Sequence, residues 1–202
     1  MVPASRASMW RHGYANPTDY DDNGRNCGGF HAQWEINNGN CGLCGDNWSD
    51  AVREHETPNK YGNEIITGVY RPNEEVEVLV EVTANHEGYF TFRLCAAEPG
   101  QDPSQDCLDQ SVLLVMPEMT DRYVLPSTKP GVYSTHVRLP DIECERCVLQ
   151  WTYTAGNTRF KYNILYKNQT PSKLKHFNNL LQVSSDNFAQ YSFSSRIQTN
   201  IL

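Results

Sequence analysis

Glu75-Val76-Glu77-Val78-Leu79-Val80-Glu81-Val82 is the stretch that decides the fold class of this chain. Valine takes every second position in it, so the four valines share one face of an extended backbone, while acidic residues hold most of the other face. A helix would instead repeat its apolar positions every three or four residues. The alternation therefore predicts a β-strand with one apolar face.

Further runs on both sides of this stretch are short, rich in β-branched or aromatic residues, and separated by turn residues. Together the seven runs span residues 64–70, 75–84, 89–95, 111–115, 122–125, 132–139 and 146–154. No amphipathic helix of convincing length interrupts them. Seven short strands joined by turns predict an all-β fold, an immunoglobulin/fibronectin III-like β-sandwich, over residues 64–157.

Residues 1–63 have a different texture, rich in Gly, Asn, Asp, Pro and Cys and without a sustained strand or helix period. Such a composition predicts loops, and loop regions of this length tend to be functional. We expect disulfides to hold this Cys-rich loop region at the N-terminal end of the sandwich. Residues 1–157 would then form one domain.

Seven cysteines stand at positions Cys27, Cys41, Cys44, Cys95, Cys107, Cys144 and Cys147. Their density is typical of an oxidising compartment and a disulfide framework. Two C-x-x-C spacings would indicate zinc in an intracellular protein, but they lie about 100 residues apart, and we favour disulfides. Cys95 and Cys107 flank a turn-rich loop, so we expect them to pair. The odd count leaves one thiol outside the disulfides, and the other pairings stay open.

The last 45 residues, 158–202, contain neither Gly nor Cys, whereas residues 1–157 hold all 13 Gly and all seven Cys. The charge reverses as well, because six Lys/Arg against one Asp give this segment a net charge of +5, and the other 11 basic and 23 acidic residues give −12 upstream. This composition is closer to a disordered extension than to a sandwich. We expect an atypical basic tail that packs poorly and carries no site.

The chain of 202 residues has a formal net charge of −7, which argues against nucleic-acid binding, since that requires a concentrated basic patch. No window approaches the roughly 20 apolar residues of a membrane span, and no apolar leader follows Met1. The cysteines and the glycosylation sequons at Asn47 and Asn168 nevertheless favour secretion. We expect a secreted, monomeric glycoprotein, and the ends of this sequence are not expected to be those of the mature protein.

The six histidines are His12, His31, His55, His86, His136 and His176. Any one of them, taken alone, is more often a surface or core residue than a metal ligand. His86 differs by its context, because it follows the end of the alternating strand, where a loop can present a ring on a rigid support. The residues alone leave His86 as a candidate metal ligand.

Several blocks of the chain occur in a distinctive order between residues 2 and 157. They are Pro3-Ala4-Ser5-Arg6-Ala7-Ser8-Met9-Trp10-Arg11, Asn16-Pro17, Tyr20-Asp21-Asp22-Asn23, Cys27-Gly28-Gly29-Phe30, Gln33-Trp34, Cys41-Gly42-Leu43-Cys44-Gly45-Asp46, Ala84-Asn85-His86-Glu87-Gly88-Tyr89-Phe90 and Cys147-Val148-Leu149-Gln150-Trp151-Thr152-Tyr153. The series resembles the animal, insect-type lytic polysaccharide monooxygenases of the chitin-binding type-4 group. The resemblance covers about three quarters of the chain.

The resemblance implies a copper ion held in a histidine brace. In that site an N-terminal histidine supplies its amine and a ring nitrogen, and a second histidine supplies the third nitrogen, a donor set that suits copper. By motif the second histidine maps onto His86, and the first lies upstream of Met1. The axial aromatic of the family is assigned to no residue here, because Phe160 and Tyr162 stand outside its motif.

We therefore expect copper-dependent oxidative cleavage of chitin or a related β-1,4-glycan by the full-length parent, with the 202-residue chain inactive by itself. The alternative is a non-catalytic secreted chitin-binding or cuticle-associated module that keeps the sandwich without the brace. Tyr20 and Trp48, aromatic residues of the Cys-rich loop region, are the candidates for stacking on sugar rings.

Overall fold

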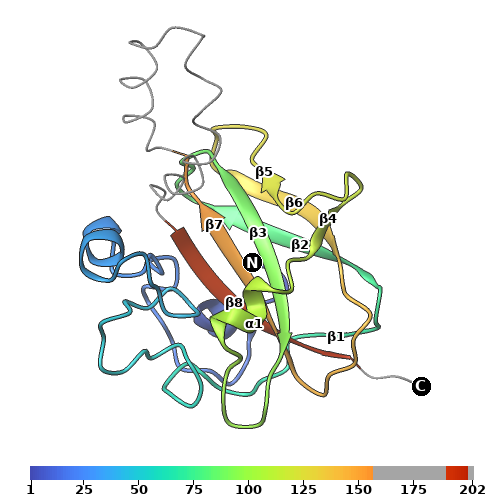
Figure 1. Cartoon of the computed structure of the whole chain (residues 1–202), viewed down its shortest axis with the longest axis horizontal. Coiled ribbons are helices and arrows are strands. Elements are labelled where there is room, and N and C mark those ends of the chain that lie inside the picture. The colour runs from blue at the N-terminus through green and yellow to red at the C-terminus, as the bar shows by residue number, and fades with distance from the viewer. Residues whose placement is uncertain (157–189, 200–202) are drawn as a thin grey trace, which may run out of the picture.

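A computed structural model describes residues 1–156 and the backbone of residues 190–199. The strands form a five-stranded sheet of order β1-β8-β7-β3-β5 and a three-stranded sheet of order β2-β6-β4, and Figure 1 shows β2 and β6 crossing behind β3 and β7. Their bounds are β1 Val69–Tyr70, β2 Glu75–Val82, β3 Tyr89–Ala96, β4 Leu114–Met116, β5 Tyr123–Val124, β6 Gly131–Arg138, β7 Cys147–Thr154 and β8 Gln190–Thr199. The predicted β-sandwich is confirmed, and each of the seven predicted runs overlaps a strand.

The apolar core lies between the two sheets. In β2 the four valines are all buried, between 0% and 5% exposed, whereas the glutamates between them are exposed, as the alternation predicts. Phe90, Phe92 and Leu94 of β3 meet them from the other sheet. Burial of such side chains stabilises the fold by roughly 2 kcal/mol for each large residue.

Strand β7 departs from the alternating pattern, since seven of its eight residues are buried. Its second face is covered by the Cys-rich loop region and by α1 (Gln105–Asp109). Gln150 on that face donates a hydrogen bond to the Leu43 carbonyl at 3.0 Å and pairs with Gln105. A strand covered on both faces has no need of polar residues at alternate positions.

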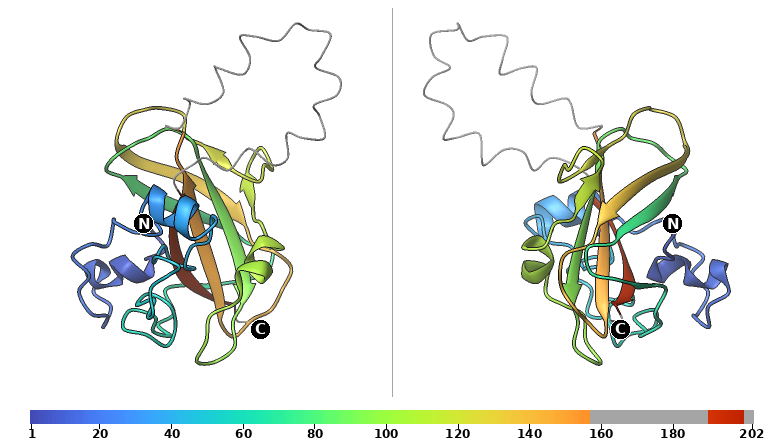
Figure 2. Two further views of the ribbon diagram at one scale, coloured as in Figure 1. Left: turned by 60° about the vertical axis from the view of Figure 1, so that its left-hand side comes forward. Right: turned by 90° about the vertical axis from the view of Figure 1, so that its right-hand side faces the viewer.

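The Cys-rich loop region gathers along one side of the sandwich (Figure 2). It contains a short 3-10 helix, η1 (Arg6–His12), and a single π-helical segment, η2 (His31–Ile36). A disulfide joins Cys27 to Cys41 across its loops. The expectation of a loop-rich region with only short helices is confirmed.

Two further disulfides lie in the sandwich. Cys95 pairs with Cys107 across a Cα–Cα distance of 6.1 Å, which confirms the predicted bridge, and Cys144 pairs with Cys147. Cys44 stands outside these three disulfides, with its sulfur 3.3 Å from the carbonyl oxygen of His55. Of the two C-x-x-C spacings, one closes on itself and the other contributes Cys41 to a different bridge.

Residues 190–199 lie within the segment that we expected to pack poorly, yet they form β8. Its backbone pairs with β7 from Cys147↔Ile197 to Thr154↔Gln190, and with β1 at Val69 and Tyr70. The segment does contain a strand pattern, since aromatic or β-branched residues stand at alternate positions at Tyr191, Phe193 and Ile197. Its atypical overall composition made this pattern easy to miss. Residues 158–189 and 200–202 lie outside the described residues, and the domain boundary at residue 157 stays a prediction.

Across the described part of the chain, no helix combines the length and the apolar character needed to cross a bilayer.

Candidate functional site

The candidate site is the tight loop between β2 and β3 that carries His86. Glu87 has a positive φ of 59° and Gly88 a φ of 91°, so the chain reverses here through left-handed conformations. A Cβ at position 88 would overlap the Thr154 carbonyl, which is why glycine is required there. The loop thus packs directly against the end of β7.

Hydrogen bonds hold the backbone of this loop from the β7 side. The His86 N–H donates to the Tyr153 hydroxyl at 2.8 Å, and the same hydroxyl donates to the Glu87 carbonyl at 2.8 Å. The Gly156 N–H donates to the His86 carbonyl at 2.9 Å. Both backbone polar groups of His86 are therefore bonded to β7 or to the residues just after it.

Asn85 holds the loop from the opposite side. Its side-chain amide nitrogen lies 3.0 Å from the Ser127 carbonyl and 2.9 Å from the Lys129 carbonyl, while its side-chain oxygen accepts from the Glu87 N–H at 2.8 Å. The loop is thereby connected to the segment between β5 and β6. A loop fixed at both ends and on both sides presents its side chains from a rigid support.

The ring of His86 is half-buried. No described residue makes a hydrogen bond to its imidazole nitrogens, whereas buried polar atoms normally have partners. Among the described residues, the ring nitrogens therefore have no hydrogen-bond partner.

Followed backward from Val2 to Met1, the chain approaches this loop along the edge of β2. The Val2 N–H donates to the Leu79 carbonyl at 2.8 Å and the Leu79 N–H donates back at 2.9 Å, so Val2 extends the β2 edge as an antiparallel bridge. Val2 faces Leu79, so facing positions in this register add up to 81 and Met1 falls opposite Val80. Each residue placed before Met1 in the same register would advance one position along β2 toward its end at Val82 and the loop beyond.

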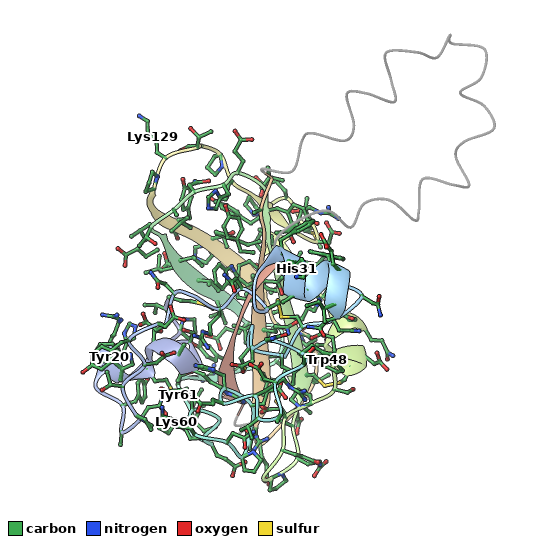
Figure 3. The ribbon with its side chains drawn as sticks, turned by 90° about the vertical axis from the view of Figure 1, so that its left-hand side faces the viewer. Tyr20, His31, Trp48, Lys60, Tyr61 and Lys129 are labelled. Carbon is green, nitrogen blue, oxygen red and sulfur yellow. A yellow bond between two sulfur atoms is a disulfide. The ribbon has the colours of Figure 1, made fainter. Side chains whose placement is uncertain are left out.

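The aromatic residues proposed for glycan stacking lie elsewhere. Tyr20 is 88% exposed and contacts Trp10 edge-on, and Trp48 is 46% exposed with the Arg53 guanidinium 4.9 Å from its ring centroid. Figure 3 shows Tyr20, Trp48 and Lys129 at three separate places on the molecule. The Lys129 carbonyl accepts a hydrogen bond from Asn85, so Lys129 marks the position of the His86 loop. The structure therefore brings neither the Tyr20 ring nor the Trp48 ring together with that loop.

The other described histidines lie in environments that differ from that of His86. His55 is 1% exposed, with its ring nitrogens 2.8 Å from Asp46 Oδ1 and 3.0 Å from Asp19 Oδ2. His31 and His136 are exposed, and His31 lies 3.5 Å from Glu35. His12 is exposed too, and partial burial together with the Met1 amine lowers the pKa of its ring. His176 lies outside the described residues.

A comparison with known protein families agrees with the fold and with the motif blocks. A family model described as "Lytic polysaccharide mono-oxygenase, cellulose-degrading" matches residues 1–179. The chain belongs to the lytic polysaccharide monooxygenase family. Members of this family cleave polysaccharides oxidatively with copper as cofactor. No curated protein matches the chain.

A solved structure of a lytic polysaccharide monooxygenase is also similar to this one. It is the lytic polysaccharide monooxygenase AA15 from Thermobia domestica in the Cu(I) state, with a TM-score of 0.80 and 32% sequence identity over 98% of this chain and 96% of that chain. The similarity confirms the family expected from the motif blocks, and copper as the cofactor of the monooxygenase parent.

The described residues do not form a metal site by themselves. Within residues 1–156, no three His, Cys, Asp or Glu side chains come together in a way that could hold a metal ion. His86 offers one imidazole, whereas a brace needs three nitrogens. The residues that the structure describes therefore do not complete a copper centre.

The sequence pointed to His86 but not to Tyr153 or Asn85, the side chains that hold its loop. Both residues fall within the motif blocks, yet their hydrogen bonds join positions 67 and 44 residues apart. Only the pairing of β3 with β7 brings Tyr153 under the loop, since Phe90 faces Tyr153 in that ladder.

Proposed function

We propose that this monooxygenase oxidises chitin or a related β-1,4-glycan, and that His86 is the second histidine of its copper brace. The observation that carries the proposal is the geometry of the His86 loop. Its backbone is held by Tyr153, Gly156 and Asn85, while its ring is left without a hydrogen bond from any described residue. A ligand histidine needs this combination of a fixed backbone and an available ring nitrogen.

The register of Val2 on β2 gives independent support. In a form of the protein that carries residues before Met1, the third residue upstream would face Thr83 and the fourth would face Ala84, because facing positions add up to 81. An N-terminal histidine at that distance would reach the neighbourhood of His86. When bound there, copper would supply the redox chemistry, and the chain's own contribution would be to hold the His86 ring in place.

A non-catalytic glycan-binding module is the second candidate. The broad exposure of Tyr20 and Trp48 favours it, since flat exposed rings can stack on sugars without a metal. Secretion belongs to either candidate and is supported by the three disulfides. The intact mass of the secreted protein would also show whether Asn47 carries a glycan.

The experiment compares two forms of the protein, the 202-residue chain and a form extended upstream so that processing exposes His-Gly. We expect the extended form to bind Cu(II) tightly in calorimetric titration and, with ascorbate, to release oxidised oligosaccharides from chitin that mass spectrometry detects. A polypeptide of the 202 residues alone offers one imidazole at the proposed site, that of His86, and should bind Cu(II) weakly and release no oxidised oligosaccharides. Cellulose serves as the competing substrate.

His86→Ala in the extended form should abolish both copper binding and product release. The matched control is His31→Ala, because His31 is exposed and its partner is Glu35 at 3.5 Å. Tight copper binding that survives His86→Ala would show that another residue is the ligand. Binding to chitin with no oxidised product from the extended form would favour the non-catalytic module.

A further inference from the structure

The hydroxyl of Tyr153 contacts two successive residues of the His86 loop in complementary ways. It accepts a hydrogen bond from the His86 N–H and donates one to the Glu87 carbonyl, both at 2.8 Å. A phenol has one proton to donate, and Glu87 uses it. The side chain is 4% exposed, so water does not compete for these bonds.

The ring of Tyr153 is itself held firmly. It packs edge-on against Phe90 with 5.3 Å between centroids, and lies parallel to the Trp151 ring at 6.5 Å. Its backbone is central in the five-stranded sheet, paired with Phe90 of β3. The hydroxyl therefore projects from one of the most tightly packed parts of the sandwich to the base of the loop.

The loop needs such support because its conformation is costly. Glu87 holds a positive φ of 59° although it carries a Cβ, and non-glycine residues keep such a conformation where surrounding contacts enforce it. The Tyr153 hydroxyl bonds the carbonyl of Glu87 as well as the amide of His86. It thus fixes the peptide group before His86 and the peptide group after Glu87, and so holds the turn that carries the His86 side chain from both sides.

We propose that Tyr153 is a positioning residue for the copper ligand His86. The proposal rests on the function proposed above, and it adds a residue that acts through hydrogen bonds to the backbone of the ligand rather than to its ring. Groups that orient a metal ligand typically change metal affinity about 10–100-fold when they are removed. Removing the hydroxyl at position 153 should therefore lower the copper affinity, because the loop would hold the His86 ring less firmly.

The test is Tyr153→Phe, which removes both hydrogen bonds and keeps the ring. Tyr123→Phe is the matched control, because Tyr123 also stacks on Phe90, at 5.9 Å, and its hydroxyl makes no hydrogen bond to the loop within the described residues. On the 202-residue chain, residue-resolved amide exchange by NMR should show the His86 amide exchanging at least about tenfold faster in Tyr153→Phe. The amides of the β3–β7 ladder should keep their rates, which shows that the sandwich remains folded.

On the extended form, Tyr153→Phe should weaken Cu(II) binding about tenfold and alter the Cu(II) electron paramagnetic resonance spectrum, while Tyr123→Phe changes neither. Unchanged exchange at the His86 amide, or an unchanged copper spectrum and affinity, would overturn the proposal. If the extended form with Tyr153 intact fails to bind copper, the proposed function falls, and the exchange rates still decide whether Tyr153 holds the loop.

Discussion

Between the two sheets the buried side chains are almost all apolar, whereas the Cys-rich loop region buries many charged and polar side chains beside its apolar ones. The sandwich core is built from residues such as Val78, Phe92 and Leu149. The loop region instead buries Ser5, Arg6, Asp19, Asp22, Gln33, Asn37, Asp46 and His55. The two regions lie against each other in one chain and are stabilised by different interactions.

His55 is the centre of the buried polar groups in the loop region. Its ring lies between Asp46 and Asp19 and stacks on Tyr61 with 4.5 Å between centroids. Asp46 also accepts from the His55 backbone N–H at 3.1 Å. Burial alone would raise the pKa of Asp46, but hydrogen bonds from His55 and the charges of His55 and Arg25 hold it below its ordinary value.

Arg6 and Asp102 connect the two regions. They form a bidentate pair at 2.5 Å although 96 residues separate them, and their side chains are 1% and 5% exposed. Arg6 also donates to the His55 carbonyl at 2.8 Å, and Asp102 accepts from the Thr57 N–H at 2.7 Å. The pair therefore satisfies backbone groups of the loop region at its contact with the sandwich.

The difference follows from how each region satisfies its backbone. In the sandwich, the strand ladders pair the N–H and C=O groups, and the side chains are left to pack. The loops of residues 1–63 lack ladders, so buried backbone groups such as those of His55 and Thr57 need side-chain partners. In the loop region, charged side chains therefore supply the hydrogen bonds to the backbone that neighbouring strands supply in the sandwich.

Removing packing from the sandwich should have the largest effect on stability. Phe92 is fully buried in the core, and Phe92→Ala should lower the free energy of unfolding by about 3–5 kcal/mol, through lost burial and the cavity left behind. Chemical denaturation followed by circular dichroism measures the change. If the free energy of unfolding fell by less than about 1 kcal/mol, the sheets would have closed over the cavity. That result would contradict the view that the sandwich depends on dense packing.

Removing one charge between the regions should have the next largest effect. Asp102→Asn leaves the Arg6 guanidinium buried without its counter-charge and should cost about 3 kcal/mol. The control is Asp109→Asn, whose pair with Arg93 is half exposed and should be worth less than about 1 kcal/mol. Equal effects of the two substitutions would contradict the distinction between the buried pair and the exposed one.

Acid should produce the smallest effect, confined to the loop region and its contact with Asp102. The pKa of Asp102 is held down as well, because hydrogen bonds and charge from Arg6 and hydrogen bonds from Thr57 outweigh the burial that would raise it. A carboxylate whose pKa is lower in the folded state contributes stability that is fully present above its unfolded pKa near 4 and is lost as the pH falls below that value.

Trp10, Trp34 and Trp48 report on the loop region, and Trp151 on the sandwich. Between about pH 5 and pH 3, we expect tryptophan fluorescence to change while the far-ultraviolet circular dichroism of the strands persists. A simultaneous change of both signals would show that the two regions unfold together in acid.

Local pattern was enough to predict the strands and one disulfide. Val76 to Val82 show the alternation of β2 in the sequence itself, and the short loop between Cys95 and Cys107 made their bridge predictable. The motif blocks also led to the family and to His86. Strand β8 was missed because its alternation lies within a segment of atypical composition.

Sequence by itself determined the period of the strands, the framework of cysteines and the family, because each of these is written in residues that are close along the chain. Only the tertiary structure decided that Tyr153 supports His86, that Arg6 pairs with Asp102, and that His55 belongs to a buried polar group rather than to a metal site. These contacts join residues 67, 96 and 9 positions apart. Their geometry depends on which faces the sheets and loops turn toward each other, and no local period encodes that arrangement.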